Sequence, residues 1–226
     1  MKHTFLLIAI LFFFSCGKDK VVLLPEISHS EITEILDVSP AYLFYDETQK
    51  DSVELNRKNL IVTTNWLVNV DKRLTLKQAI PHITLLQEKK RNSSHKNENA
   101  KNYFTCNDIS RKNLGFIEFT DVFYHVESSS DYFNKNSNLK PSESSIGINV
   151  DFNNSITIIT PDSDPFIIQT NKENVINDLK KVIPDTKTVY LNFNSALTFQ
   201  DYISFKSLIL SLENKSIHIS NNEFIY

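Results

Sequence analysis

The chain has 226 residues, with 24 Lys and Arg against 27 Asp and Glu, and its formal net charge at pH 7 is -3. Because the composition is not basic and no basic stripe is visible, nothing in the sequence favours binding to nucleic acid. The chain contains only two cysteines, so its fold depends on a packed core, to which 16 Phe and 8 Tyr contribute.

The N-terminus has the pattern of a bacterial secretory signal peptide. Lys2 supplies a positive charge, and residues 5–14 form an unbroken apolar run that is too short to span a bilayer. Cys16 follows directly after the small residue Ser15. This arrangement resembles the signal of bacterial lipoproteins, in which the cysteine is lipidated and becomes the first mature residue. The alternative is an ordinary signal peptide with a coincidental cysteine.

The mature chain is therefore predicted to begin at Cys16 and to be lipid-anchored in a Gram-negative cell envelope, on the periplasmic or surface side of the outer membrane. Residues 1–15 are the predicted signal peptide, and residues 16–25 the predicted lipidated tether. Lys18-Asp19 resembles half of a signal for export to the cell surface; the alternative is a solvated tether. No later run of 18 apolar residues occurs, so we expect no membrane-spanning helix.

A block of the sequence recurs 123 residues further along the chain. Val68-Asn69-Val70-Asp71 corresponds to Leu191-Asn192-Phe193-Asn194, and the apolar positions that follow coincide nearly everywhere, except that Ile83 is matched by Lys206. Alternation predicts a strand at the start of each copy.

A helix is predicted after each of these strands. Thr75 and Thr198 stand where a helix N-cap belongs, with Gln or Asp three residues later. The following apolar residues recur at helical spacing, which predicts that they face a sheet. Four of them are expected to be core residues: Leu76, Ile80, Phe199 and Ile203.

A hairpin is predicted before each block. The two hairpins pair residues 41–45 with 52–55 and residues 155–160 with 165–170. A weaker match, 115 residues apart, relates the segment after the first hairpin to the segment after the second. In the second copy this segment predicts a helix over residues 172–183. In the first copy residues 60–64 are rich in β-branched side chains and fit a strand equally well.

The predicted fold class is α+β, with two tandem β-β-α-β-α-β units, each a small mixed sheet with helices packed on one face. The first unit covers residues 26–127, including an added strand pair within 114–126, and the second covers residues 146–226. Residues 128–145 are polar and aperiodic, and we expect them to be a linker.

The order of elements in each unit is similar to that of the periplasmic domain of the ExbD/TolR biopolymer-transport family. In that family a strand ends in an apolar-x-apolar-Asp motif before a turn and a helix, and Val68-Asn69-Val70-Asp71 resembles this motif. The second copy has Asn194 in place of Asp. The resemblance implies a fold, a tendency to pair, and binding to envelope proteins or cell wall. The family's transmembrane helix, which carries an ionisable residue, has no counterpart here, so proton-driven energisation is not expected.

No constellation of residues predicts catalysis, a metal site or a cofactor. His95 and Glu98 have metal-like spacing but lie in a Lys- and Asn-rich stretch that is expected to be solvated. Cys106 paired with a distant His is a conceivable nucleophile, but a buried free thiol is the simpler expectation. One stretch carries aromatic side chains on both faces of a predicted strand, so one face is a candidate partner-binding surface: Phe116, Phe119, Phe123 and Tyr124.

Two functions from different classes remain open on this evidence. The leading prediction is a non-enzymatic envelope lipoprotein that binds an envelope protein or peptidoglycan, with a link to biopolymer transport and the potential to form a homodimer. The alternative is an envelope hydrolase with its site in the cleft between the two units. Convergence of Cys106, His125 and an Asp in a pocket would favour the alternative.

Overall fold

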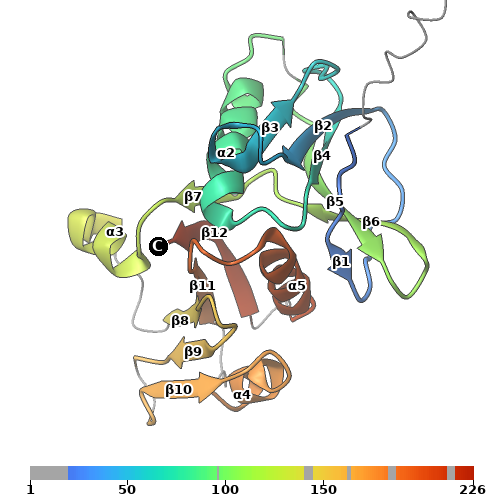
Figure 1. The fold of residues 1–226 in the computed structure, drawn as a ribbon. Coiled ribbons are helices and arrows are strands. Elements are labelled where there is room, and N and C mark those ends of the chain that lie inside the picture. The colour runs from blue at the N-terminus through green and yellow to red at the C-terminus, as the bar shows by residue number, and fades with distance from the viewer. Residues whose placement is uncertain (1–19, 96, 140–144, 162–163, 183–186, 213–216) are drawn as a thin grey trace, which may run out of the picture.

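The computed structural model describes residues 20–95, 97–139, 145–161, 164–182, 187–212 and 217–226. The predicted signal peptide, Cys16 and residues 17–19 of the predicted tether lie outside these residues. The described part contains two mixed six-stranded sheets with helices, which confirms the predicted α+β class with two units (Figure 1).

The first sheet belongs to the first unit and has the strand order β1-β5-β4-β2-β3, with β6 added beside β5. Strands β2, β4, β5 and β1 are parallel to one another, whereas β3 is antiparallel to β2 and β6 is antiparallel to β5. The strands are β1 (Glu26–Ile27), β2 (Val38–Tyr45), β3 (Val53–Asn56), β4 (Asn65–Val70), β5 (Asn102–Asp108) and β6 (Asn113–Glu118).

The second sheet has the order β10-β9-β8-β11-β12-β7. Its strands are β7 (Phe123–His125), β8 (Ser145–Val150), β9 (Ile156–Ile159), β10 (Ile167–Thr170), β11 (Lys187–Phe193) and β12 (Ile217–Ile225). The helices of the described residues are α2 (Leu76–Arg91), α3 (Ser129–Lys135), α4 (Val175–Val182) and α5 (Phe199–Leu210), with short 3-10 turns η2 (Lys50–Ser52) and η3 (Ser137–Leu139).

The two copies of the repeat meet through reciprocal hydrogen bonds at the starts of α2 and α5. The amide of Leu76 donates to the carbonyl of Leu197 at 2.9 Å, and the amide of Phe199 donates to the carbonyl of Leu74 at 2.6 Å. Thr75 and Thr198 form a bridge between these segments. The two bonds join equivalent residues of the two copies, with donor and acceptor exchanged. The two units are therefore related by an approximate two-fold axis.

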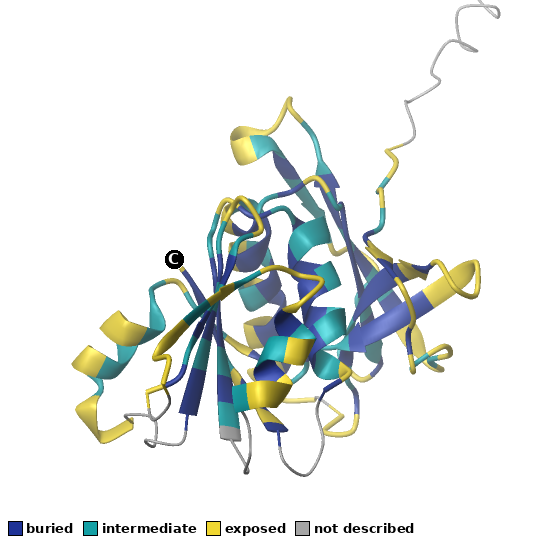
Figure 2. Ribbon diagram, turned by 90° about the horizontal axis from the view of Figure 1, so that it is seen from below, coloured by how far each residue is buried: buried dark blue, intermediate teal, exposed yellow. Residues whose placement is uncertain are grey.

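Helices α2 and α5 lie between the two sheets, where their buried faces form one core (Figures 1 and 2). Thr75 caps α2 in a reciprocal capping box with Gln78, as predicted. Four side chains expected in the core are buried: Leu76, Ile80, Phe199 and Ile203. In α5, Tyr202 contacts Phe104 of the first sheet and Phe193 of the second. The two units therefore share their core.

Both predicted hairpins form, as the β2–β3 and β9–β10 pairs, but they are not equivalent. In the second sheet β11 pairs with β8, and β8 pairs with β9, so the counterpart of the β2–β3 hairpin is β8–β9, and β10 is an additional strand. The weaker match 115 residues apart is therefore wrong as a structural equivalence. Residues 57–64 form turns, so the first unit lacks the helix that α4 supplies in the second.

The boundary between the units also differs from the prediction. Of the strand pair expected within 114–126, β6 joins the first sheet, whereas β7 pairs with β12 in the second. The predicted linker begins with a folded helix, α3, capped by Ser128. Tyr132 and Phe133 of α3 pack on Phe224, on the face of the second sheet opposite α5. This sheet is therefore covered by helices on both faces, not on one.

The predicted tether is part of the fold from Lys20 onward. Lys20 forms ion pairs with Asp46 and Glu54 at the β2–β3 hairpin. The amide of Leu23 donates to Asp71, and the following residues form strand β1 along β5. This segment is held in place by hydrogen bonds that involve backbone groups. Such bonds leave no recognisable pattern in the sequence.

Candidate functional site

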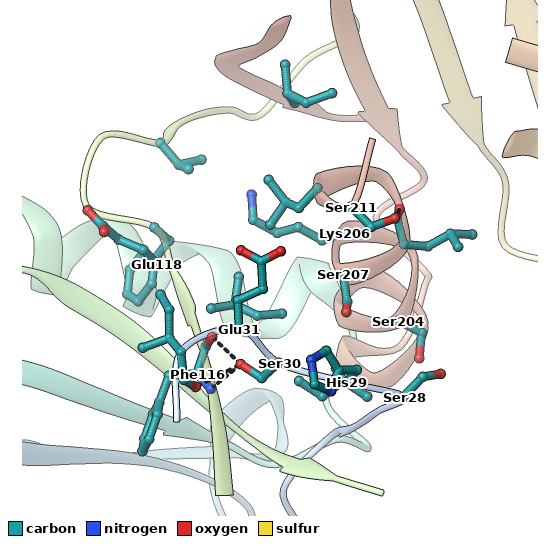
Figure 3. A pocket seen from close by; sticks show the side chains of 18 of the residues that line it. Ser28, His29, Ser30, Glu31, Phe116, Glu118, Ser204, Lys206, Ser207 and Ser211 are labelled. Carbon is teal, nitrogen blue, oxygen red and sulfur yellow. Dashed lines mark hydrogen bonds between the residues drawn. The ribbon is translucent and has the colours of Figure 1, made fainter. Parts of the chain in front are cut away.

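A cleft of about 770 Å³ opens between the two units (Figure 3). One wall consists of β1 and the residues after it, together with the end of β6 and the turn that follows. The other wall consists of the outer face of α5 and part of β12. Its volume lies within the range of small-molecule and peptide-side-chain sites.

The two walls carry different polar groups. Ser204 and Ser207 of α5, with Ser211 just after the helix, lie along one side and face the cleft, while the carboxylate of Glu31 projects from the opposite wall (Figure 3). Glu118 also lies on that wall, but its carboxylate forms an ion pair with Lys101. Helix α5 is fixed at its start because the Thr198 hydroxyl accepts from the Asp201 amide. The row of hydroxyls is thus held on a rigid element.

A buried ion pair lies at the base of the cleft. Lys206 of α5 contacts Glu223 of β12, and both side chains are almost completely excluded from solvent. The Tyr202 hydroxyl donates to the second carboxylate oxygen of Glu223 at 2.7 Å, and it lies 3.1 Å from the Tyr124 hydroxyl. Burial, reinforced by the charge of Glu223, raises the pKa of both tyrosines well above the usual value. The network is therefore held as neutral phenols around one carboxylate–ammonium pair.

The aromatic residues predicted as a partner-binding surface do not form an exposed strip. Phe116 and Phe119 are buried in the fold, and Phe119 stacks on Phe104 with a 3.8 Å distance between ring centroids. Tyr124 joins the buried network, and only Phe123 is exposed, beneath the guanidinium of Arg91. The four residues are not on one continuous strand, because β6 ends at Glu118 and the chain turns. Phe116 and Phe119 line the cleft nevertheless.

The structure does not bring together the predicted thiol–imidazole pair. Cys106 is fully buried in β5 and does not line the cleft, and burial raises the pKa of its thiol to about 12. A thiol with this pKa is uncharged near neutral pH, whereas the thiolate is the nucleophile. His125 lies on β7 in the second sheet, where its Nε2 is 2.8 Å from Oδ1 of Asn222.

Lys206 and Glu223 were not among the predicted site residues. The repeat did contain a signal, since Lys206 occupies a position at which the other copy has the apolar residue Ile83, inside an otherwise matching apolar pattern. A charged residue at a core position requires a buried partner. The partner itself, Glu223, had no recognisable signal in the sequence.

Comparison of the chain with protein-family models, with curated proteins and with solved structures finds no match. Within the described ranges, no group of three or more His, Cys, Asp or Glu side chains is placed to hold a metal ion. The same residues contain no helix long and apolar enough to cross a membrane.

A second buried lysine makes a testable contribution to stability. Lys90 of α2 donates to the carbonyl oxygens of Thr64 and Lys101 and to Oδ1 of Asn102, and burial lowers its pKa to about 8. Between pH 8 and the ordinary lysine pKa the unfolded chain binds more protons than the folded chain, so this group makes stability rise with pH.

We expect the free energy of unfolding of the natural protein, relative to that of Lys90→Met, to increase by about 1 kcal/mol from pH 8 to pH 9. Urea unfolding at each pH, followed by the fluorescence of the single tryptophan, Trp66, measures the difference. Parallel pH profiles for the two proteins would contradict this assignment.

Proposed function

We propose that this protein is a non-enzymatic, lipid-anchored binding protein of the Gram-negative cell envelope, whose cleft between the units holds an envelope protein or cell-wall partner. The observation that carries the proposal is the cleft itself. Its deepest charges, Lys206 and Glu223, neutralise each other, and its walls offer hydroxyl and carboxylate groups beside apolar side chains. Such a surface suits recognition by hydrogen bonds and packing.

The resemblance to the ExbD/TolR periplasmic domain supports a role in the same environment, with biopolymer transport as the associated process. Asp71 and Asn194, which end the matched strands, make the same turn, because each accepts a hydrogen bond from the amide two residues later. The two units also pair through the reciprocal bonds at Thr75 and Thr198. One chain would thus supply the paired arrangement that the resemblance implies.

The cleft is tested by placing a photo-cross-linking amino acid at Ser207. We expect Ser207 to give a defined adduct in living cells, whereas the same amino acid at the exposed Phe152, outside the cleft, gives none. Ser204→Trp, which fills the cleft, should abolish the adduct, while abundance and thermal stability stay unchanged. Adducts of equal yield at both positions would contradict binding in the cleft.

The lipid anchor is tested separately. Cys16→Ala should release the protein from membranes into the soluble fraction, because the described chain has no spanning helix and the acyl chains supply the anchoring free energy, roughly 0.8 kcal/mol for each buried methylene. Fractionation of cells followed by mass spectrometry of the mature N-terminus gives the result. Retention of Cys16→Ala in detergent-washed membranes would contradict lipid anchoring.

The alternative, an envelope hydrolase, is favoured by one observation: the carboxylate of Glu31 faces a row of hydroxyls across the cleft (Figure 3). The Ser207 adduct distinguishes the two functions. If the protein only binds its partner, the cross-linked partner is intact both in the natural protein and in Glu31→Gln. If the protein is a hydrolase, the cross-linked partner is cleaved in the natural protein and intact in Glu31→Gln.

A further inference from the structure

Four turns gather at one end of the molecule, where the parallel strands β2, β4, β8 and β11 end. These turns are hereafter the turn face: residues 46–52, 71–75, 151–155 and 194–198. In the first unit the side-chain amide of Gln78 donates to the carbonyl of Asp51 at 2.8 Å, and in the second Asn154 donates to the carboxylate of Asp201 at 3.4 Å. Gln78 and Asp201 are equivalent residues of α2 and α5, and the starts of these helices are bonded to each other. The turn face is therefore continuous across the two units.

The helices that begin at the turn face lead away from it. Since β4 is parallel to β5 and β11 is parallel to β12, α2 and α5 each carry the chain from the end of one strand to the start of the next. The 16 residues of α2 span about 24 Å. The loop after α2, which includes the exposed Ser94, therefore lies at the opposite end of the molecule.

The first described residues of the chain are held at the turn face. Lys20 forms an ion pair with Asp46 at 2.7 Å, and the amide of Lys72 donates to the carbonyl of Leu23, also at 2.7 Å. Lys20 follows the predicted lipidation site, Cys16, by four residues in the sequence. A chain of this length spans at most about 14 Å. A lipid on Cys16 therefore keeps Lys20, and with it the turn face, close to the bilayer surface.

Two large apolar side chains are exposed on or beside the turn face. Phe152 of the β8–β9 turn is 65% exposed, and Val21, next to Lys20, is 66% exposed. The β8–β9 turn is closed by the Asn154 amide, which donates to the carbonyl of Asp151 at 2.8 Å, so Phe152 is presented on a fixed loop. Exposed apolar side chains among charged ones suit the boundary between lipid headgroups and acyl chains.

The charges of the turn face are mixed. Lys50 and Arg73 are exposed there, but so are Glu47 and Asp51. Attraction to anionic lipids requires an excess of basic side chains. The burial of apolar surface, together with the short connection to the lipid, therefore has to supply the contact with a membrane.

We propose that the turn face lies on the membrane that holds the lipid anchor, with Phe152 and Val21 at the boundary between headgroups and acyl chains. The inference rests on the lipid anchoring proposed above and adds an orientation to it. The cleft follows α5 from Gln200, in the first turn of the helix, to Ser211, just after its end. With the turn face on the bilayer, the cleft leads away from the membrane surface toward the aqueous side.

The experiment measures how closely single positions approach the acyl chains. The full-length lipidated protein carries one new cysteine, which is labelled with a nitrobenzoxadiazole fluorophore: Phe152→Cys, Gln49→Cys or Ser94→Cys. Cys106 is fully buried and Cys16 carries the lipid, so only the introduced cysteine reacts. Each protein is added to phosphatidylcholine vesicles with or without nitroxide groups on the acyl chains, which quench the fluorophore at short range. Flotation of the vesicles shows whether the protein is bound.

We expect quenching at least about 3-fold stronger at Phe152→Cys and Gln49→Cys than at Ser94→Cys, because an interfacial apolar surface enters the bilayer by about 5–10 Å whereas the far end of α2 lies about 24 Å away. Equal quenching at the three positions of a floating protein would overturn the orientation and leave the lipid anchor in place. A natural protein that does not float would overturn the anchor and this proposal with it. Quenching at Phe152→Cys without quenching at Gln49→Cys would also overturn the proposal, since only the label would then enter the bilayer.

A second variant tests the apolar contact with the label on the other unit. Phe152→Asp places a charge in the contact, so quenching at Gln49→Cys should fall by at least about half. Leu85→Asp is the matched control, because Leu85 is 42% exposed in the third turn of α2 and lies off the turn face. Quenching that is equal in the two variants would mean that Phe152 does not contact the membrane, which would contradict the proposal.

Discussion

Lys206→Met is expected to lower the free energy of unfolding by about 3–5 kcal/mol, because it leaves the carboxylate of Glu223 buried without its counter-charge. Glu223→Gln is expected to have an effect of similar size, because it leaves the ammonium of Lys206 buried beside a neutral amide. Both side chains are almost fully excluded from solvent, so water cannot replace the lost partner. Urea unfolding followed by Trp66 fluorescence measures both effects.

The double variant separates this explanation from a simple loss of packing. Lys206→Met together with Glu223→Gln removes both charges. The double variant should therefore lose less free energy of unfolding than the two single variants added together, by at least about 1 kcal/mol. Lys135→Met breaks an ion pair with Glu127 at an exposed position and should leave stability nearly unchanged. Additive effects of the two core substitutions would contradict a coupled pair.

Phe199→Ala is expected to lower the free energy of unfolding by about 3–5 kcal/mol. The ring is fully buried at the start of α5 and lies 5.2 Å from the ring of Phe104, so its removal leaves a cavity where the two units meet. Because both units contribute to this contact, they should unfold in a single transition. Thermal unfolding monitored by circular dichroism and by Trp66 fluorescence tests the coupling.

Phe152→Ala is the matched control, since Phe152 is 65% exposed and its truncation should change stability very little. Two separate transitions in Phe199→Ala would mean that the units fold independently and would contradict the shared core. A loss well under 1 kcal/mol would show that the site collapses around the missing ring.

The repeat was predictable from sequence because each of its parts is encoded by neighbouring residues. Alternation fixes which faces of β4 and β11 are buried, and a threonine with Gln or Asp three residues later defines a helix start. The structure confirms Thr75 and Thr198 as N-caps. It also places Asn69 and Asn192 at equivalent positions of the two sheets, paired with β2 and β8 respectively. The α+β class follows from these local patterns.

The site was not predictable in the same way, because its residues come together only through long-range packing. Lys206 was visible as a charged residue in an apolar pattern, but Glu223 lies on another element. The cleft forms where residues 26–32 lie against α5 and β12, and nothing in the composition of residues 21–32 marks them as part of a sheet.

Two elements near the predicted boundary show the same limit. Strand β7 lies in a stretch whose apolar composition predicts a strand, but its place beside β12 in the second sheet depends on which edge is open. Helix α3 is short and polar in sequence, and it is held because Tyr132 and Phe133 meet Phe224 from a distant strand. The sequence alone determined the repeated strand, turn and capped helix, because hydrogen-bonding and apolar periodicity are local. Only the tertiary structure decided the position of residues 21–32, the cleft and the buried ion pair, because each depends on contacts between residues far apart in the chain.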